Sequence, residues 1–159
     1  MRRLFILLFS ALFACSAALA SGIEANVVAA NKGDIDAMHN LGVAHANGES
    51  VPQDFSKAYE WFYRAALKGQ HNSMYSLAVM NRLGQGRKVD LVSAYVWYGF
   101  AAEHIPKDAD EWFIPRAKVA MFLRRPGEIE RMLSESELSS AKALRQKLAQ
   151  RIERRQRAQ

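Results

Sequence analysis

Four histidines are the side chains best suited to chemistry, because histidine serves both as a metal ligand and as a general base. They are His39, His45, His71 and His104. His39 and His45 are six residues apart, so a helix would place them on different sides, whereas a helical zinc site uses histidines four residues apart. The sequence also contains no His-Glu-x-x-His run. We therefore expect no metal site and no cofactor.

The other polar candidates have ready structural roles. Asp34 and Asp36 flank an expected helix start, where a carboxylate accepts backbone hydrogen bonds. Ser134 and Ser136 suit the start of a later helix in the same way. The run Gly84-Gln85-Gly86 is a turn signal and only a weak candidate for a phosphate-binding loop. Because no nucleophile is paired with a base, we expect a protein that is not an enzyme.

An internal repeat of 36 residues organises the chain. Eleven residues of one unit recur unchanged in the next, without a gap: Gly33, Met38, Leu41, Val43, Gly48, Asp54, Ala58, Tyr59, Trp61, Ala65 and Ala66 correspond to Gly69, Met74, Leu77, Val79, Gly84, Asp90, Ala94, Tyr95, Trp97, Ala101 and Ala102. A fixed period of this length is the sequence signature of a repeat architecture. Ala29-Ala30 stands 36 residues before Ala65-Ala66, so a half repeat precedes the first full unit.

Each unit is predicted to form two helices. The first helix of unit one is expected to start near Asp36, to turn Leu41 into the core, and to end at Gly48. The second is expected to be capped by Asp54 and to stop at Gly69. Unit two follows the same plan with Asn72, Leu77, Gly84, Asp90, Trp97 and Ala102.

The paired alanines predict close contact between helices. Their small side chains allow neighbouring helices to approach, and Trp61 and Trp97 are expected to fill the space beside them. One helix pair cannot bury its apolar face alone, so successive pairs must stack. The predicted fold is all-α, a short α-solenoid of antiparallel helix pairs with a C-terminal capping helix.

The first unit resembles the Sel-one-like repeat (SLR), a tetratricopeptide-related α-solenoid unit of about 36 residues. The residues that carry the resemblance are Leu41-Gly42, Gly48, Val51, Asp54, Lys57-Ala58, Trp61, Ala65-Ala66 and Gly69. Unit two departs from the pattern at Ala78, Asn81 and Arg87 and is a degenerate copy. The resemblance implies a non-catalytic scaffold for protein interactions, a type often exported in bacteria.

The expected organisation is a signal peptide at 1–20, a half repeat at 21–33, repeats at 34–69 and 70–105, and a degenerate third unit with a basic capping helix at 106–159. Within the last part, a helix is expected to be interrupted or to start near Pro115, and Pro126 suits the first turn of the next one. Ser134 and Glu137 fit a capping box. An apolar stripe then follows on the final helix: Leu138, Ala141, Leu144, Leu148 and Ile152.

The last helix is strongly basic and carries most of the excess positive charge of the chain, which is +6 overall. Its cations are Lys142, Arg145, Lys147, Arg151, Arg154, Arg155 and Arg157, against Glu153 alone. One interpretation is a solvated face whose charges suit the negative end of the helix dipole. The other is contact with an anionic surface, such as lipid headgroups or an acidic partner. We expect no nucleic acid partner, because the chain carries an export signal.

The N-terminus has the pattern of a secretory signal. Arg2 and Arg3 precede an apolar run, and Ala18-Leu19-Ala20 places small residues where a signal peptidase cleaves. The mature protein is then expected to begin at Ser21 and to lie in the periplasm. The run 12–15, which ends in Cys15, also resembles a lipobox, so a lipid-anchored envelope lipoprotein is the alternative.

The predicted function is to bind another protein on the concave face formed by the first helices of the repeats. Positions flanking Leu41 and Leu77 are the candidate binding residues, which match groove positions of tetratricopeptide-type repeats by resemblance. They are Asp36, His39, Val43 and Asn47 in unit one and Asn72, Tyr75, Val79 and Arg82 in unit two. Tyr75 is expected to be an exposed aromatic contact, and Arg82 to bind a carboxylate. The alternatives are an envelope enzyme acting on cell-wall or lactam substrates, and a structural lipoprotein.

Overall fold

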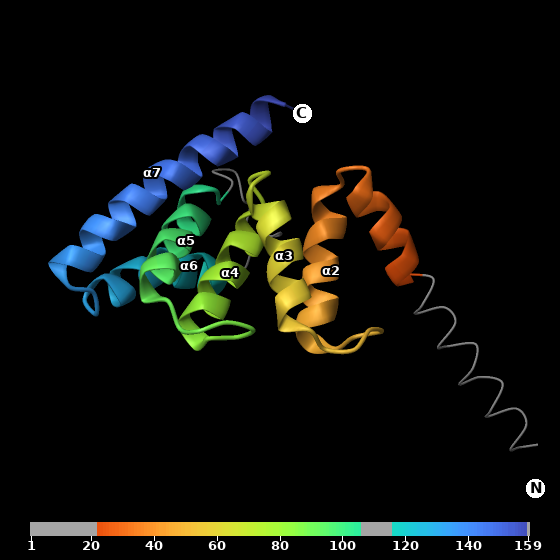
Figure 1. Ribbon diagram of the computed structural model, residues 1–159, viewed down its shortest axis with the longest axis horizontal. Coiled ribbons are helices and arrows are strands. Elements are labelled where there is room, and N and C mark those ends of the chain that lie inside the picture. The colour runs from red at the N-terminus through yellow and green to blue at the C-terminus, as the bar shows by residue number, and fades with distance from the viewer. Residues whose placement is uncertain (1–21, 106–115, 159) are drawn as a thin grey trace, which may run out of the picture.

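The computed structural model describes residues 22–105 and 116–158, and every regular element in these ranges is a helix (Figure 1). A helical segment at 22–31 comes first. It is followed by α2 (Ile35–Asn47), α3 (Phe55–Ala66), α4 (His71–Leu83), α5 (Leu91–Glu103), α6 (Arg116–Glu130) and α7 (Glu135–Arg157). The predicted all-α fold of helix pairs is therefore confirmed. The expected signal sequence lies outside the described residues.

The second helix of each repeat starts where the sequence predicts. The Asp54 carboxylate accepts the backbone N–H of Lys57 at 3.0 Å, and the Asp90 carboxylate accepts that of Ser93 at 2.8 Å. Both caps satisfy donors that the helix itself leaves unpaired. The backbone hydrogen bond at Lys57 also lowers the pKa of Asp54.

The first helices start within one residue of Asp36 and Asn72, at Ile35 and His71, but the capping residues lie two positions earlier than expected. Asp34, not Asp36, caps α2 by accepting the N–H of Ala37 at 2.8 Å. Gln70, not Asn72, caps α4 by accepting the N–H of Asn72 at 2.7 Å. Asp34 and Asp36 are the same residue type, so only the extended backbone of Asp34 decides which of them is the cap. The two caps remain 36 residues apart, and the period is unchanged.

Glycines end the first helices by adopting a left-handed conformation, as predicted. Gly48 has φ 75° and Gly84 has φ 70°, and their N–H groups bond to the carbonyls of Ala44 and Met80. A residue with a Cβ adopts this conformation only with strain. The chain then returns antiparallel to form α3 or α5.

The two helices of repeat one approach closely at Gly42. A Cβ placed on Gly42 would lie 2.5 Å from the Phe62 ring of α3, which is closer than real Cβ atoms come to other heavy atoms. Phe62 is 3% exposed, and the neighbouring Ala58, Ala65 and Ala66 are fully buried. The small residues predicted to permit close helix contact therefore do so in the structure.

The two tryptophans of the repeats are not equivalent. Trp97 is 2% exposed in the main core, as the sequence predicts. Trp61 is only partly buried, against the small cluster beneath helical segment 22–31, and the Arg64 guanidinium lies 4.3 Å from its ring centroid. Trp61 thus packs against the cluster that contains Ala65, as expected, but it is less buried than Trp97. The half repeat before Trp61 supplies less covering surface than a full unit.

The two C-terminal helices are α6, which contains Pro126, and α7, which starts with a capping box. Pro126 was expected in the first turn of a helix, and this was wrong, because it lies inside α6. The helix continues through Pro126, whose nitrogen donates no backbone hydrogen bond. Helix α7 starts with the predicted capping box of Ser134 and Glu137. These hydrogen bonds lower the pKa of Glu137. The apolar stripe of α7 buries Ala141, Leu148 and Ile152.

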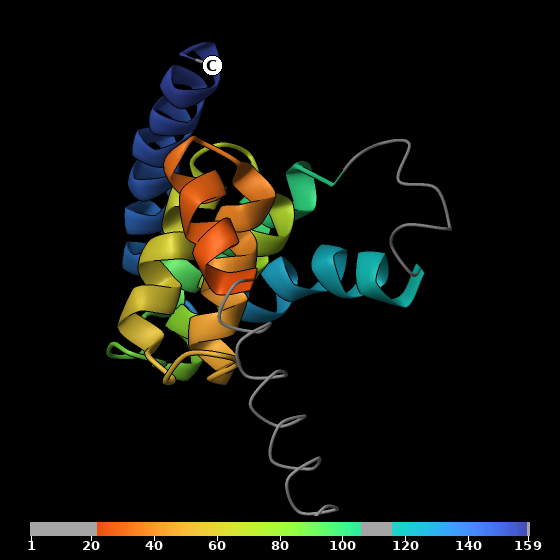
Figure 2. The ribbon, with the colours of Figure 1, turned by 90° about the vertical axis from the view of Figure 1, so that its right-hand side faces the viewer.

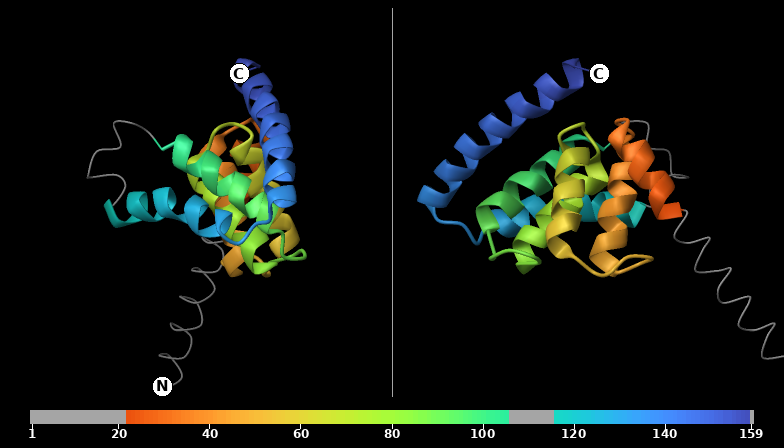
Figure 3. Two further views of the ribbon diagram at one scale, coloured as in Figure 1. Left: turned by 90° about the vertical axis from the view of Figure 1, so that its left-hand side faces the viewer. Right: turned by 45° about the vertical axis from the view of Figure 1, so that its right-hand side comes forward.

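Helices α6 and α7 lie on opposite sides of the body formed by α2 to α5 (Figures 2 and 3). Helix α6 contacts α5, and its Phe122 packs on Tyr75 of α4. Helix α7 crosses α5 and α3, where Arg145 pairs with Glu103 and Arg151 donates to the Tyr63 hydroxyl at 2.7 Å. Among the described residues, no helix combines the length and the apolar character needed to cross a membrane.

The contact between Gly42 and Phe62 gives a stability prediction. We expect Gly42→Ala to destabilise the protein by about 1–3 kcal/mol, the usual effect of overpacking a core. Gly127→Ala is the matched control, because Gly127 lies inside α6 and a Cβ there meets nothing within 4 Å. That control should be neutral or stabilising by up to about 1 kcal/mol. Chemical denaturation measures both, and equal effects of the two substitutions would contradict the close packing.

Candidate protein-binding groove

A groove of about 210 Å³ lies between the first helices of the two repeats. Its walls come from α2 and α4, and Phe62 of α3 closes its floor. Its lining includes Val43, Asn47, Phe62, Tyr75 and Val79. Because Val43 and Val79 are 36 residues apart, the repeat itself places an equivalent branched side chain on each of the two helices.

The structure brings together four of the eight residues that the sequence selects, namely Val43, Asn47, Tyr75 and Val79. Sequence reasoning did not select Phe62, which also lines the groove. The residue that could have indicated this role is Gly42. Because Gly42 has no side chain, the Phe62 ring can approach the backbone of α2 and border the groove.

His39 and Asp36 connect the repeats to each other. His39 Nδ1 lies 2.8 Å from the Ser73 hydroxyl of α4, and its ring lies 5.4 Å from that of Phe62. The exposed Asp36 carboxylate accepts from the side-chain amide of Gln70 at 3.3 Å. Both residues therefore link the first repeat to the second, His39 through Ser73 of α4 and Asp36 through Gln70, which caps α4.

The contact between His39 and Ser73 is a hydroxyl–imidazole pair that the sequence did not suggest. Ser73 has no exposed surface, so a substrate cannot reach its hydroxyl from solvent. A nucleophile must meet the reacting atom directly. We therefore assign this pair a structural role between the repeats.

Tyr75 was expected to be an exposed aromatic contact, and this was wrong. Its ring stacks on Phe122 of α6 with centroids 4.4 Å apart, and it meets the ring of Tyr98 edge-on at 5.3 Å. Tyr75 is thus half-buried, with one part facing the groove and the other covered by α6. The sequence did not reveal that α6 would fold back onto this helix.

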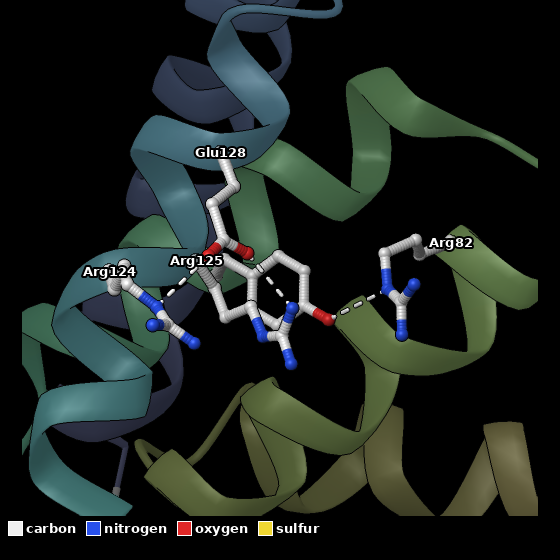
Figure 4. A network of polar contacts seen from close by, with 5 residues as sticks. Arg82, Arg124, Arg125 and Glu128 are labelled. Carbon is white, nitrogen blue, oxygen red and sulfur yellow. Dashed lines mark hydrogen bonds and ion pairs between the residues drawn. The ribbon is translucent and has the colours of Figure 1, made fainter.

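A group of three arginines, called here the basic rim, consists of Arg82, Arg124 and Arg125 (Figure 4). Of these, Arg125 hydrogen-bonds to Tyr75. Arg82 Nε donates to the Tyr98 hydroxyl at 3.3 Å. Arg124 and Arg125 of α6 share one carboxylate, that of Glu128, at 2.9 and 2.8 Å. Among the described residues, the three arginines of the rim therefore share one carboxylate partner, which leaves an excess of positive charge.

The protonation states of the rim follow from its contacts. Burial raises the pKa of Tyr98, against the opposing effect of its hydrogen bond from Arg82, so the phenol stays neutral. Burial opposes the charge of Arg125, but hydrogen bonds to Tyr75 and Glu128 outweigh it and raise its pKa. Arg125 therefore remains a cation at every physiological pH.

Asn72 lies in the first turn of α4, outside the groove lining. It is half-buried, and its side-chain oxygen Oδ1 is buried without a hydrogen-bond partner within the described part of the chain. As for metal ligands, residues 22–105 and 116–158 contain no group of three His, Cys, Asp or Glu side chains that could hold an ion.

Comparison with known proteins finds a family model that matches the two repeats. The model of the Sel1 repeat matches residues 35–70 and 71–104. The crystal structure of c5321, a protective antigen present in uropathogenic Escherichia coli strains that displays an SLR fold, superposes with a TM-score of 0.70 at 25% identity, over 84% of this chain and 26% of that one. This chain thus spans about a quarter of the length of c5321.

A Sel1 repeat protein from Oxalobacter formigenes has the same fold, with a TM-score of 0.53 at 22% identity over 63% of this chain and 42% of that one. No curated protein sequence matches the chain.

The stacking of Tyr75 on Phe122 predicts energetic coupling between α4 and α6. A double-mutant cycle of Tyr75→Ala and Phe122→Ala should give a coupling energy of about 0.5–1.5 kcal/mol, typical of an aromatic pair. Chemical denaturation of the four proteins measures it. The same cycle between Tyr75 and the exposed Met132 should give none. A coupling energy of zero for Tyr75 and Phe122 would mean that α6 does not pack on α4.

Proposed function

We propose that this chain, which is a Sel1-like repeat protein, binds a segment of a partner protein in the groove between α2 and α4. Sel1 repeat proteins generally mediate protein–protein interactions. The observation that carries the proposal is the groove itself, which needs both repeats and is lined by residues that recur at the repeat period.

The size of the groove favours a side chain over a small-molecule cofactor. Pockets for drug-sized ligands start at about 300 Å³, and this groove is smaller. Val43, Val79 and the edge of Phe62 offer an apolar surface. An aliphatic or aromatic side chain of the partner would fill it and act as the anchor of the interface.

The basic rim adds charge selectivity. Arg125 hydrogen-bonds to Tyr75, which lines one wall of the groove. Arg82 hydrogen-bonds to Tyr98, whose ring meets that of Tyr75. A guanidinium can bind a carboxylate through two parallel hydrogen bonds. The partner segment is therefore expected to carry an acidic residue close to its apolar anchor, and binding should weaken with increasing salt.

We place this interaction in the bacterial cell envelope, on the basis of the secretory pattern at residues 1–20. Mass spectrometry of the protein purified from a bacterial host tests the location. The expected mature chain begins at Ser21. A chain that begins with an acylated Cys15 would favour the lipoprotein, and an intact Met1 would argue against export.

Photo-crosslinking tests the groove directly. We expect a photoreactive amino acid at Val79 to crosslink the partner in cells, whereas the same group at Met132 should not. Met132 is a matched control because it is apolar and 62% exposed but lies between α6 and α7. Val79→Asp and Arg82→Glu should each weaken capture of the crosslinked partner at least about tenfold.

Lys142→Glu is the control for charge, since Lys142 is exposed on α7, on the opposite side of the body from α6. Circular dichroism is the control that checks whether each variant is folded. Folded Val79→Asp and Arg82→Glu proteins that capture the partner at full strength would move the binding site away from this groove.

A further inference from the structure

A second concave region lies on the other side of the molecule, beneath the C-terminal end of α7. One cavity of about 220 Å³ is bordered by segment 30–33, the end of α3 and Arg155. A neighbouring cavity of about 400 Å³ is bordered by Arg151, Arg154 and Arg155 of α7. Leu67 and Arg155 line both, so the two cavities adjoin. In Figure 1, this end of α7 extends past α5 toward the top of α3.

The lining of the two cavities is strongly basic. Within the described part of the chain, its lining includes five cations and no acidic side chain. The cations are Arg64, Lys68, Arg151, Arg154 and Arg155. Among the described residues, no ion pair engages Lys68, Arg154 or Arg155. Unneutralised like charges gathered in a concave surface repel one another and raise the local concentration of anions.

The cations are held in place by contacts of their own elements. Ile152 is 3% exposed, which fixes this part of α7 against the core. Arg151 donates to the Tyr63 hydroxyl, and the Arg64 guanidinium stacks on Trp61. Gln156 of α7 also lies close to Gly69. A Cβ placed on Gly69 would lie 2.8 Å from the Nε2 atom of Gln156. The fold therefore brings the cations at the end of α3 next to those of α7. The basic residues of α7 alone do not form the site.

The spacing within α7 also directs the charges to one side. Arg151, Arg154 and Arg155 are related by three and four residues, so they share a helix face. Like charges at this spacing destabilise an isolated helix. An anion bound between them would offset that repulsion.

We propose that the two adjoining cavities form a binding site for a compact ligand with two or more phosphate groups, separate from the groove between α2 and α4. A phosphate monoester carries about 1.5 to 2 negative charges at neutral pH, whereas a carboxylate carries one. Two phosphates therefore match five cations better than a short acidic peptide does. Four of the cations are arginines, whose planar forks bind phosphate oxygens in pairs.

The ligand can be a soluble phosphorylated compound or the headgroup of a phospholipid with two phosphates, and both present the same chemistry. Isothermal titration of the full protein with inorganic tripolyphosphate tests the soluble source. Flotation with phosphatidylcholine vesicles containing cardiolipin tests the lipid source. Hexaglutamate is the comparison for an acidic protein segment.

We expect at least one phosphate probe to bind, and the double variant Arg64→Gln with Arg155→Gln to weaken that binding at least about tenfold. Lys142→Gln is the matched control, because it removes one cation of α7 that lines neither cavity; it should change binding less than about twofold. Thermal unfolding checks that the variants fold, and a bound probe should raise the unfolding temperature of the unmodified protein.

Three outcomes would overturn the proposal: no binding of either phosphate probe, equal weakening by Lys142→Gln, or hexaglutamate binding as tightly as tripolyphosphate. The single variant Arg154→Gln keeps the test informative if the double variant does not fold. Because neither Arg64 nor Arg155 lines the groove between α2 and α4, their loss should leave partner crosslinking at Val79 unchanged.

Discussion

The contact of the Phe62 ring with the backbone at Gly42 connects most features of this molecule. It sets how closely α2 and α3 approach, since any side chain at Gly42 would overlap the ring. The same ring packs against His39, which reaches across to Ser73 of α4. It also closes the floor of the groove. One aromatic side chain thus joins the two helices of a repeat, contributes to the junction between repeats, and forms part of the surface to which we assign binding.

The third helix pair makes the two faces of the array different. Helix α6 stacks Phe122 on Tyr75 and contributes Arg124 and Arg125 to the basic rim, and Arg125 hydrogen-bonds to Tyr75 of the groove. Helix α7 crosses the opposite side, where its end meets α3 and segment 30–33 to enclose a strongly basic space. A two-repeat array by itself would offer neither the rim nor the second region.

The sequence predicts the parts of this fold that depend on local chemistry. The caps at Asp54 and Asp90 and the left-handed glycines at the ends of α2 and α4 follow from residue type and period. Asp34 and Asp36 are two residues apart and of the same type, so residue type alone could not predict which of them caps α2. The unequal burial of Trp61 and the cover over Tyr75 depend on segments that are distant in sequence and outside the matched repeats. Periodicity selected Val43 and Val79 for the groove, but it could not show that α3 supplies its floor.

The central claim is that the groove between α2 and α4 is the surface that a partner occupies. Methyl NMR of valine-labelled protein tests it most directly, because Val43 and Val79 line the groove while Val27 and Val89 are exposed elsewhere. On addition of a peptide from the crosslinked partner segment, the methyl signals of Val43 and Val79 should shift or broaden, and those of Val27 and Val89 should stay unchanged. Shifts confined to Val27 or Val89, with Val43 and Val79 unaffected, would contradict the account.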